Sequence, residues 1–180
     1  YLGGYETHKN VVTLLNAYTY VAGALGEEYP LLLAGRKPDG TSAAFPDYDG
    51  LIERAGLSRF VRWIGYVDEA DKPLLYRSAE VFAFPSRHEG FGLPPLEAMA
   101  CGTPVVVGDS GSLPEVIGPA GFAIDPDDVR GMAGAIIALV MDEQQAADLR
   151  RAGPQQAAQF TWERTAKETL DVYRRVTGDE

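Results

Sequence analysis

Two carboxylates on either side of a glycine-containing segment have the clearest chemical potential in this sequence. Glu89 precedes Gly90-Phe91-Gly92-Leu93, and Glu97 follows in a predicted helix that begins near Pro94-Pro95. Proline favours the first helical turn, and the unpaired N–H groups of a helix N-terminus attract anions such as phosphate. Glycines let an anion approach the backbone, and a carboxylate accepts hydrogen bonds from vicinal hydroxyl groups. The pattern predicts a nucleotide-sugar site, with a diphosphate over residues 90–93, a ribose at Glu97 and a second polyol at Glu89.

Two other interpretations of this segment stay open. In the structural interpretation, Gly90 and Gly92 permit a tight turn and both glutamates are solvated. In the other, a strand, a Gly-x-Gly and a helix form a dinucleotide-binding fingerprint. Against that fingerprint stand Pro95 at the third glycine position, the four residues 86–89 between the strand and Gly90, and a short helix before Gly102.

Two further loops follow predicted strands and carry polar residues. Lys9 lies near the start of the first long predicted helix, where its ammonium group could offset the charge of a departing diphosphate. Alone, a lysine in such a place is more often a solvated surface residue. Ser112 and Glu115 have the spacing of a helix capping box, a structural role that makes Glu115 the weaker candidate for a ligand contact.

The composition excludes several classes of protein and site. The 180 residues include 16 Lys and Arg against 26 Asp and Glu, a formal net charge of −10. This balance argues against nucleic-acid binding and against a polybasic membrane module. Cys101 is the only cysteine, and His8 and His88 are the only histidines, so a multi-cysteine or multi-histidine metal site is excluded. Apolar runs stay below the roughly 18 residues that a membrane span needs, and no signal peptide opens the chain.

Short apolar runs alternate with amphipathic stretches through most of the chain. Several runs are mostly apolar and end at Gly or Pro, which is typical of parallel strands covered on both faces. The alternation predicts an α/β fold, a Rossmann-like doubly wound parallel sheet with right-handed crossovers, and ligands at the carboxyl ends of its strands. About six strands are expected: Tyr1–Gly3, Leu31–Gly35, Val61–Gly65, Val81–Pro85, Pro104–Gly108 and Phe122–Asp125.

The C-terminal portion is predicted to be helical. Gly153-Pro154 predicts a break or kink in the middle of three helices, and Trp162 and Tyr173 predict that the last helix packs through aromatic anchors. The sequence contains no linker and no internal repeat, so residues 1–180 are expected to form a single domain. The three helices are expected at Asp127–Met141, Glu143–Gln159 and Trp162–Val176.

The segment from Phe84 to Val107, FPSRHEGFGLPPLEAMACGTPVVV, resembles the motif of group 1 (family 4) glycosyltransferases. The resemblance extends over nearly the whole chain: YLGG and HKN resemble the family's first strand and phosphate-binding loop, and LLLAG and VRWIGYV its second and third strands. Such enzymes retain the anomeric configuration and have the two-domain GT-B architecture. The resemblance implies that this sequence is the second, nucleotide-sugar-binding domain. The first, acceptor-binding domain would lie outside it, and a start at Tyr1 fits a piece of a longer protein.

The resemblance also implies roles for individual residues. Glu89 would hold hydroxyl groups of the transferred sugar near its reacting face, and Lys9 would stabilise the departing diphosphate, so these two are the expected catalytic residues. Glu97 would bind the ribose. Backbone N–H groups of Gly90, Phe91, Gly92 and Leu93 would contact the sugar and the diphosphate.

The base and the diphosphate clamp complete the implied site. Gly65, Tyr66 and Val67 would line the base, mainly through their backbone. Many members of the family carry an arginine where this sequence has Gly4, so the clamp is expected to be weaker or to use another basic residue beside Lys9: Arg36, Arg87 or His8. No metal or other cofactor is expected, because the donor, a UDP- or GDP-hexose, is a substrate.

The implied activity is transfer of a hexose, with retention, to an acceptor in polysaccharide or glycolipid biosynthesis. A cytoplasmic location is expected, with any membrane contact made through the absent domain, and the isolated donor domain is expected to turn over little. The stretch SLPEV resembles members that transfer mannose but does not settle the sugar. The alternatives are an epimerase or phosphorylase of the same architecture, a nicotinamide-dependent Rossmann enzyme, and a binding module without catalysis.

Overall fold

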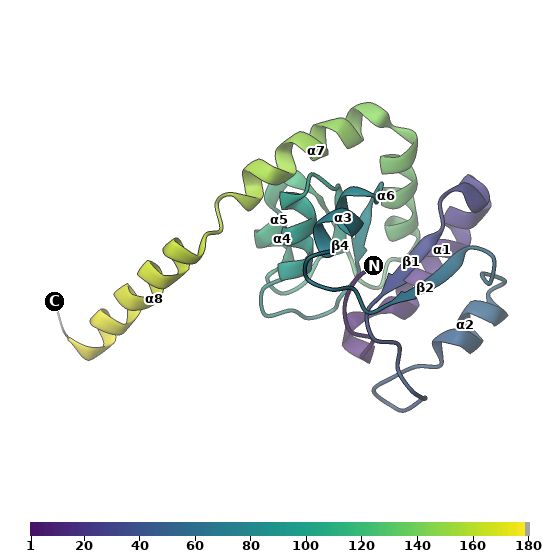
Figure 1. Cartoon of the computed structure of the whole chain (residues 1–180), viewed down its shortest axis with the longest axis horizontal. Helices are drawn as coiled ribbons and strands as arrows, with labels where there is room; N and C mark the ends of the chain where they lie inside the picture. Colours follow the sequence, from purple (N-terminus) through teal and green to yellow (C-terminus); the bar gives the residue numbers. More distant parts are fainter. Residues whose placement is uncertain (179–180) are drawn as a thin grey trace.

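Parallel strands in two groups form the centre of the structure, which the computed structural model describes for residues 1–178 (Figure 1). β1 pairs with β2, and β3, β4 and β5 form a second group in that order. Every pairing is parallel, so the predicted α/β class is confirmed. The five strands of the described residues are β1 (Leu31–Ala34), β2 (Val61–Gly65), β3 (Phe82–Phe84), β4 (Val105–Gly108) and β5 (Phe122–Ile124).

The strand predicted at residues 1–3 is reduced to an isolated bridge between Leu2 and Ala34. Its backbone still lies along β1, because the Ala34 N–H donates to the Tyr1 carbonyl at 2.9 Å and the Gly3 N–H donates to the Ala34 carbonyl at 3.2 Å. Leu2 therefore pairs only with the last residue of β1. The described residues therefore contain five strands instead of the expected six, and residues 1–3 extend the β1–β2 group.

The helices form two sets of neighbours around the strands. α1 packs against α2 and α6, while α4 packs against α3, α5 and α7. Two such sets are what a doubly wound fold with right-handed crossovers is expected to have. The bounds are α1 (Val11–Leu25), α2 (Tyr48–Arg54), α3 (Lys72–Arg77), α4 (Leu93–Ala100), α5 (Leu113–Ile117), α6 (Val129–Met141), α7 (Glu143–Ala157) and α8 (Trp162–Thr177), with short 3-10 turns η1 (Thr7–Lys9), η2 (Gly26–Glu28) and η3 (Gly118–Ala120).

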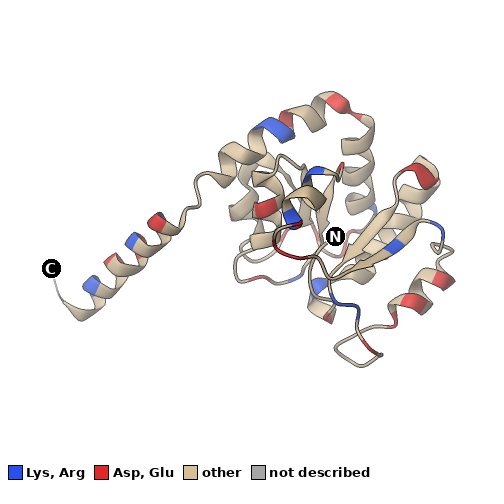
Figure 2. Ribbon diagram, viewed as in Figure 1, with Lys and Arg blue, Asp and Glu red and all other residues tan. Residues whose placement is uncertain are grey.

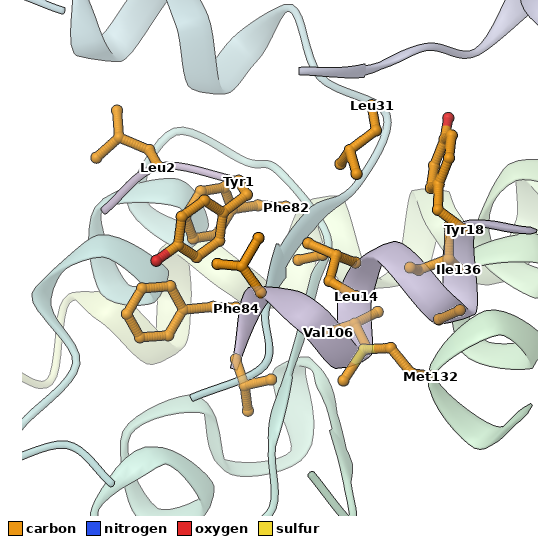
Figure 3. Close-up of a cluster of buried hydrophobic side chains, with 14 of the residues drawn as sticks. Tyr1, Leu2, Leu14, Tyr18, Leu31, Phe82, Phe84, Val106, Met132 and Ile136 are labelled. Atoms are coloured by element: carbon orange, nitrogen blue, oxygen red, sulfur yellow. The ribbon is translucent and has the colours of Figure 1, made fainter. Parts of the chain in front are cut away.

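A cluster of buried side chains joins these elements. Leu14 of α1, Phe82 of β3, Val106 of β4 and Met132 of α6 lie together (Figure 3), and each is at most 4% exposed. All four residues of β4 are buried, as expected for a strand covered on both faces. Full burial of an aliphatic or aromatic side chain contributes roughly 1.5–3 kcal/mol, so this cluster is the main source of the domain's stability.

Beside the cluster, the amino ends of β1 and β3 face each other across a groove of about 450 Å³. Its lining is mostly apolar and includes Leu2, Tyr18, Leu31, Phe82 and Ile136. We call this surface the apolar groove. It lies at the ends of the strands opposite to those where ligands bind in open α/β sheets.

The break predicted at Gly153-Pro154 is absent from the described chain, where α7 continues to Ala157. Pro154 lies in the last turn of α7, so few helical hydrogen bonds depend on it. A Cβ atom on Gly153 would lie 3.0 Å from the Met99 carbonyl oxygen of α4. The Gly-Pro pair therefore marks a close contact between α7 and α4 instead of a break.

The last helix, α8, projects from the domain (Figure 1). Trp162 is 76% exposed and Tyr173 is 64% exposed, so the prediction that α8 packs through aromatic anchors is wrong for this chain by itself. Acidic and basic residues alternate along α8 (Figure 2), and Arg164 pairs with Glu168 at 2.7 Å. None of the helices in residues 1–178 combines the length and the apolar character needed to cross a membrane.

Candidate functional site

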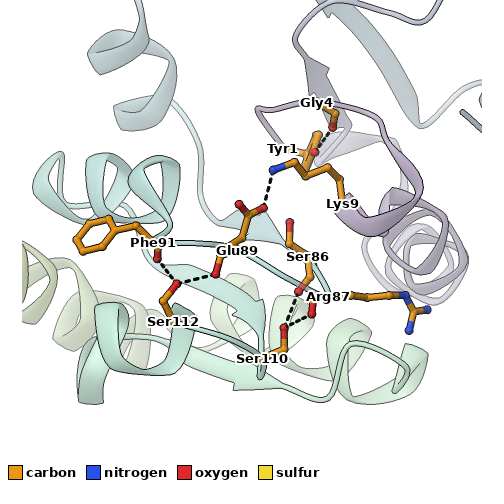
Figure 4. Close-up of polar contacts among 9 residues, drawn as sticks. All are labelled: Tyr1, Gly4, Lys9, Ser86, Arg87, Glu89, Phe91, Ser110 and Ser112. Carbon is orange, nitrogen blue, oxygen red and sulfur yellow. Dashed lines mark hydrogen bonds and ion pairs between the residues drawn. The ribbon is translucent and has the colours of Figure 1, made fainter. Parts of the chain in front are cut away.

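Three loops meet at the carboxyl ends of the strands (Figure 4). They are residues 3–10 ahead of α1, residues 85–92 between β3 and α4, and residues 109–112 between β4 and α5. The Arg87 N–H donates to the His8 carbonyl at 2.9 Å, which joins the first two loops directly. The predicted convergence of the polar residues at one edge of the sheet is therefore present.

The segment before α4 presents backbone N–H groups without partners. In the part of the chain that the structure describes, the N–H groups of Gly90, Phe91, Gly92 and Leu93 donate to no backbone carbonyl, and no side chain caps α4. Pro94 and Pro95 follow and have no N–H groups to add. Gly92 has a left-handed φ of 110°, and a Cβ atom there would lie 2.7 Å from Leu113 Cδ2. The backbone at this helix end is thus fixed in a form that suits an anion.

Two serines of the loop before α5 fix this segment from below. The Ser110 hydroxyl donates to the Arg87 carbonyl at 2.6 Å, and the Ser112 hydroxyl donates to the Phe91 carbonyl at 2.7 Å and the Glu89 carbonyl at 3.1 Å (Figure 4). The capping box predicted for Ser112 and Glu115 is not formed within the described residues: Ser112 has a helical backbone conformation, with φ −82° and ψ −12°, and its oxygen accepts from no N–H group of α5. The serine holds the glycine loop in place, a role that the sequence pattern did not indicate.

Lys9 and Glu89, predicted from different loops, are in direct contact. The Lys9 Nζ atom lies 2.7 Å from the Glu89 Oε1 atom, and the two side chains are only 20% and 14% exposed (Figure 4). The Lys9 ammonium also lies 5.9 Å from the centre of the Phe84 ring. A lysine without an ion-pair partner would be solvated, whereas the ion pair with Glu89 holds Lys9 at the edge of the glycine loop.

Asn10 sets the position of Lys9, and the sequence analysis missed it. It is 3% exposed and has a φ of 57°, the one left-handed non-glycine residue of the described chain. Its Nδ2 atom donates to the Pro85 carbonyl at 3.1 Å and to the Pro126 carbonyl at 2.7 Å, and its Oδ1 atom accepts from the Thr13 hydroxyl at 2.8 Å. The available signal was an asparagine directly before an apolar helix, since asparagine tolerates this conformation best among non-glycine residues.

Glu97 lies in the second turn of α4, at the other end of the glycine segment. A helix beginning at Pro94-Pro95 would have put it in the first turn, but α4 begins at Leu93. The Tyr76 hydroxyl donates to the Glu97 Oε2 atom at 2.8 Å. The pKa of Lys72 on α3 is raised, mainly by its hydrogen bond to Glu69 and further by the Glu97 carboxylate and by Tyr66. Glu97, Lys72 and Tyr66 therefore share one neighbourhood.

The residues predicted to line a base follow β2. Gly65 has a left-handed φ of 75°, and its carbonyl accepts from the Gly35 N–H at 2.8 Å. Tyr66 is 70% exposed, and Val67 is partly buried against the core. An exposed aromatic ring beside the Glu97 neighbourhood offers a flat surface on which a base could stack.

Gly4, where the resemblance expects an arginine, faces an acidic group. A Cβ atom on Gly4 would lie 2.2 Å from the Glu6 Oε2 atom, and this buried oxygen has no hydrogen-bond partner within residues 1–178. Arg87 turns to Asp127 instead of Glu89, and His8 is exposed. Arg36 is exposed as well, so among these basic residues Lys9 is the one that contacts Glu89 within the described chain.

A second buried oxygen without a partner belongs to Ser86. The residue is fully buried, and its Oγ atom makes no hydrogen bond to the described residues. Figure 4 shows this hydroxyl on the same side of the loop as Glu89 and Lys9. It adds a polar atom without a partner at the centre of the candidate site.

The candidate site lies outside the apolar groove and has an accessible surface. The apolar groove, and a smaller groove of about 270 Å³ beside Trp63, are not lined by Glu89, Glu97 or Lys9. Phe91 is 41% exposed and Leu93 is 47% exposed, so the surface above the glycine segment is accessible. The two carboxylates border this surface from its two ends.

The fold and the site together define a Rossmann-like domain of the GT-B type, with an uncapped helix N-terminus between two carboxylates. Comparison with known families narrows this class: the profile described as "Glycosyl transferases group 1" matches residues 1–156. The chain therefore belongs to the group 1 glycosyltransferase family, as the resemblance predicted. The GT-B fold is confirmed by solved structures.

Particular relatives show how far the similarity extends. The chain is 38% identical over 174 residues to O-antigen chain mannosyltransferase B of Escherichia coli. This alignment covers 97% of the chain and 45% of that protein. A sucrose-phosphate synthase from Thermosynechococcus elongatus superposes with a TM-score of 0.85 at 30% identity, over 99% of the chain and 45% of the synthase. Anabaena Alr3699/HepE in complex with UDP and glucose gives a TM-score of 0.82 at 25% identity, over 95% of the chain and 47% of that protein. The chain thus spans about half the length of these proteins.

Proposed function

We propose that this chain binds a nucleoside diphosphate sugar and is the donor-binding part of a retaining hexosyltransferase. The observation that carries the proposal is the row of four backbone N–H groups at residues 90–93, without backbone partners, between Glu89 and Glu97. By their names, one relative transfers mannose and one structural neighbour holds UDP and glucose. Both support a UDP- or GDP-hexose as the donor.

The diphosphate lies over the N-terminus of α4 in this proposal. The N–H groups of residues 90–93 and the positive end of the helix stabilise its charge. Lys9 leaves Glu89 and contacts the diphosphate, where its ammonium group stabilises the negative charge that develops on the leaving group. Glu89, released from Lys9, accepts hydrogen bonds from hydroxyl groups of the sugar.

The nucleoside occupies the other side of the site. Glu97 accepts hydrogen bonds from the ribose hydroxyl groups, and the backbone of Gly65, Tyr66 and Val67 borders the base. In the reaction, the bond between the anomeric carbon and the diphosphate oxygen breaks, and a bond to an acceptor oxygen forms on the same face of the sugar. The acceptor hydroxyl gives its proton to the departing diphosphate, which leaves with the electron pair of the broken bond. The chain contributes positioning and electrostatic stabilisation.

The remaining parts of the proposal concern the whole protein. The acceptor binds to a second domain outside this sequence, the reaction takes place in the cytoplasm, and no metal or other cofactor takes part. The family assignment favours a transferase over a nicotinamide-dependent enzyme. An epimerase or a phosphorylase of the same architecture is separated by a product assay on the longer protein, which distinguishes transferred sugar from free or phosphorylated sugar.

Calorimetric titration with UDP and with GDP, each with and without EDTA, tests the proposal. We expect one of the two nucleotides to bind without a metal. Lys9→Met should weaken binding by about tenfold, since an ion contact to phosphate is worth about 1.4 kcal/mol or more. Glu115→Gln, a change on the exposed side of α5, is the matched control and should leave binding unchanged. Failure of both nucleotides to bind, or a strict need for metal, contradicts the proposal.

A further inference from the structure

Tyr76 is a buried phenol whose ring position is fixed by its surroundings. It lies on α3, is 2% exposed, and packs edge-on against Phe82 with ring centres 5.2 Å apart. Its backbone carbonyl accepts from the buried Thr103 hydroxyl at 2.7 Å. Ring and backbone are therefore both held, and the hydroxyl group has a defined direction.

That direction is toward Glu97. The Tyr76 hydroxyl donates to the Glu97 Oε2 atom at 2.8 Å, and no other hydrogen bond to this carboxylate occurs within the described chain. Burial of the phenol raises the pKa of Tyr76, and the Glu97 carboxylate raises it further. The phenol therefore stays protonated and remains a donor over the whole ordinary pH range.

The single hydrogen bond from Tyr76 to one carboxylate oxygen restricts the conformation of the Glu97 side chain. A glutamate on a helix surface has several rotamers, and ordering it on ligand binding has an entropic cost. The bond from Tyr76 selects one of them in advance and leaves the Oε1 atom and the remaining lone pairs of Oε2 for another donor. A preordered group binds its ligand more tightly because this cost has already been met in folding.

We propose that Tyr76 is a positioning residue that holds Glu97 in the orientation required to accept the ribose hydroxyl groups of the donor nucleotide. This inference rests on the proposed donor site. Tyr76 does not contact the nucleotide itself; it acts only through Glu97. Its contribution is therefore confined to ligands that carry the ribose hydroxyl groups.

The test compares a nucleotide with its 2′,3′-dideoxy analogue, using whichever of UDP and GDP binds the unchanged chain. Tyr76→Phe keeps the ring against Phe82 and removes only the hydroxyl group. We expect it to weaken binding of the normal nucleotide by about tenfold, and binding of the dideoxy analogue by less than about twofold. Combined with Glu97→Gln, it should add little to the effect of Glu97→Gln alone.

Tyr18→Phe is the matched control. Tyr18 is also buried and, like Tyr76, lines the apolar groove, but its hydroxyl donates to the Tyr29 carbonyl and not to Glu97. It should leave the affinity of both nucleotides unchanged. Glu97→Asp is a second variant that does not alter Tyr76: its shorter side chain cannot reach both the phenol and the ribose, so it should show the same selective loss.

The outcomes separate the two proposals. Equal weakening of both nucleotides by Tyr76→Phe, or no weakening, overturns the positioning role while the donor site stands. Additive effects of Tyr76→Phe and Glu97→Gln also overturn it, because two residues that act through one contact are not independent. If the unchanged chain binds neither UDP nor GDP, the donor site fails, and with it this inference.

Discussion

The two groups of strands meet in different ways at their two ends. At the carboxyl ends, polar contacts join them: Asn10 bonds to Pro85 and Pro126, the Arg87 N–H bonds to His8, and Lys9 pairs with Glu89. We call this set the polar clasp. At the amino ends, the same groups face each other across the apolar groove.

The difference shows how one fold divides stability from ligand binding. Apolar contacts are non-directional and depend on the area buried, so the end of the sheet with the groove tolerates small changes of shape. Hydrogen bonds in the polar clasp depend on distance and angle and fix Lys9 to within a narrow range. A site that has to present an ammonium group and a carboxylate at set positions needs the second kind of contact.

The largest effect is expected from Asn10→Ala in the polar clasp. The change leaves the Pro85 and Pro126 carbonyls without donors and puts alanine in a left-handed conformation. We expect a loss of about 3 kcal/mol in the free energy of unfolding, measured by urea denaturation. We also expect weaker nucleotide binding in calorimetry, because Lys9 is no longer held.

Asn10→Gly separates the two causes. Glycine adopts the left-handed conformation without strain but provides no amide donor. It should recover about 1 kcal/mol of the stability lost in Asn10→Ala and little of the binding. If both variants kept the free energy of unfolding and the nucleotide affinity of the unchanged chain, the hydrogen bonds of Asn10 would not hold the clasp.

Most of the fold, and the placement of Glu89 and Glu97 on either side of the glycine segment, could be predicted from the sequence. Apolar runs such as VVVG at residues 105–108 are buried because both faces of the strand are covered, and periodicity reports this directly. Glu89 and Glu97 stand out because glycines and prolines mark the helix start between them. Such local patterns need no knowledge of distant contacts.

The clasp and the supports of the site could not be predicted, because they depend on pairs far apart in the chain. Ser112 had the pattern of a cap, but its backbone is helical and its hydroxyl points to the carbonyls of Glu89 and Phe91, which are distant in the sequence. In the sequence, Tyr76 has the pattern of an ordinary core residue. Only the structure shows that its hydroxyl donates to Glu97. Trp162 on α8 had the pattern of an anchor, yet its side chain is 76% exposed.

A smaller effect is expected from Gly4→Arg, which adds to the clasp the positive charge that many family members have. The Glu6 carboxylate occupies the space near Gly4, but it is the end of a flexible side chain and can move to pair with the new guanidinium group. We expect tighter binding of the nucleoside diphosphate by about fivefold, or roughly 1 kcal/mol, in calorimetry. The gain should shrink at high salt.

Gly4→Ala and Gly4→Arg with Glu6→Gln are the controls. Alanine adds bulk without charge and should not tighten binding. Removing the Glu6 carboxylate from the arginine variant frees the guanidinium for the diphosphate and should tighten binding further. An arginine that weakens binding in both backgrounds would place the diphosphate elsewhere than the polar clasp.

The smallest effect is expected in how the stability of the chain depends on pH, through a tyrosine at the apolar groove and a tyrosine near Glu6. Burial raises the pKa of Tyr18, which lines the apolar groove, from 10.0 to about 12. Tyr48 of α2 donates its hydroxyl to the Tyr5 carbonyl at 2.8 Å, in the loop ahead of α1. Burial, together with the Glu6 charge, raises the pKa of Tyr48 from 10.0 to about 12. The folded chain keeps these protons while the unfolded chain releases them. The stability that they contribute below pH 10 is therefore lost as the pH rises toward about 12.

Substitutions at these tyrosines and at Glu6 assign the two causes. Tyr18→Phe and Tyr48→Phe should each make the fall of the melting temperature above pH 10 shallower. Glu6→Gln should lower the pKa of Tyr48, followed by the ultraviolet absorbance of tyrosinate, and leave that of Tyr18 unchanged. A shift of both would mean that the Glu6 charge reaches the groove. A shift of neither would mean that burial alone acts at both ends, and the contrast between a polar clasp and an apolar groove would lose its electrostatic part.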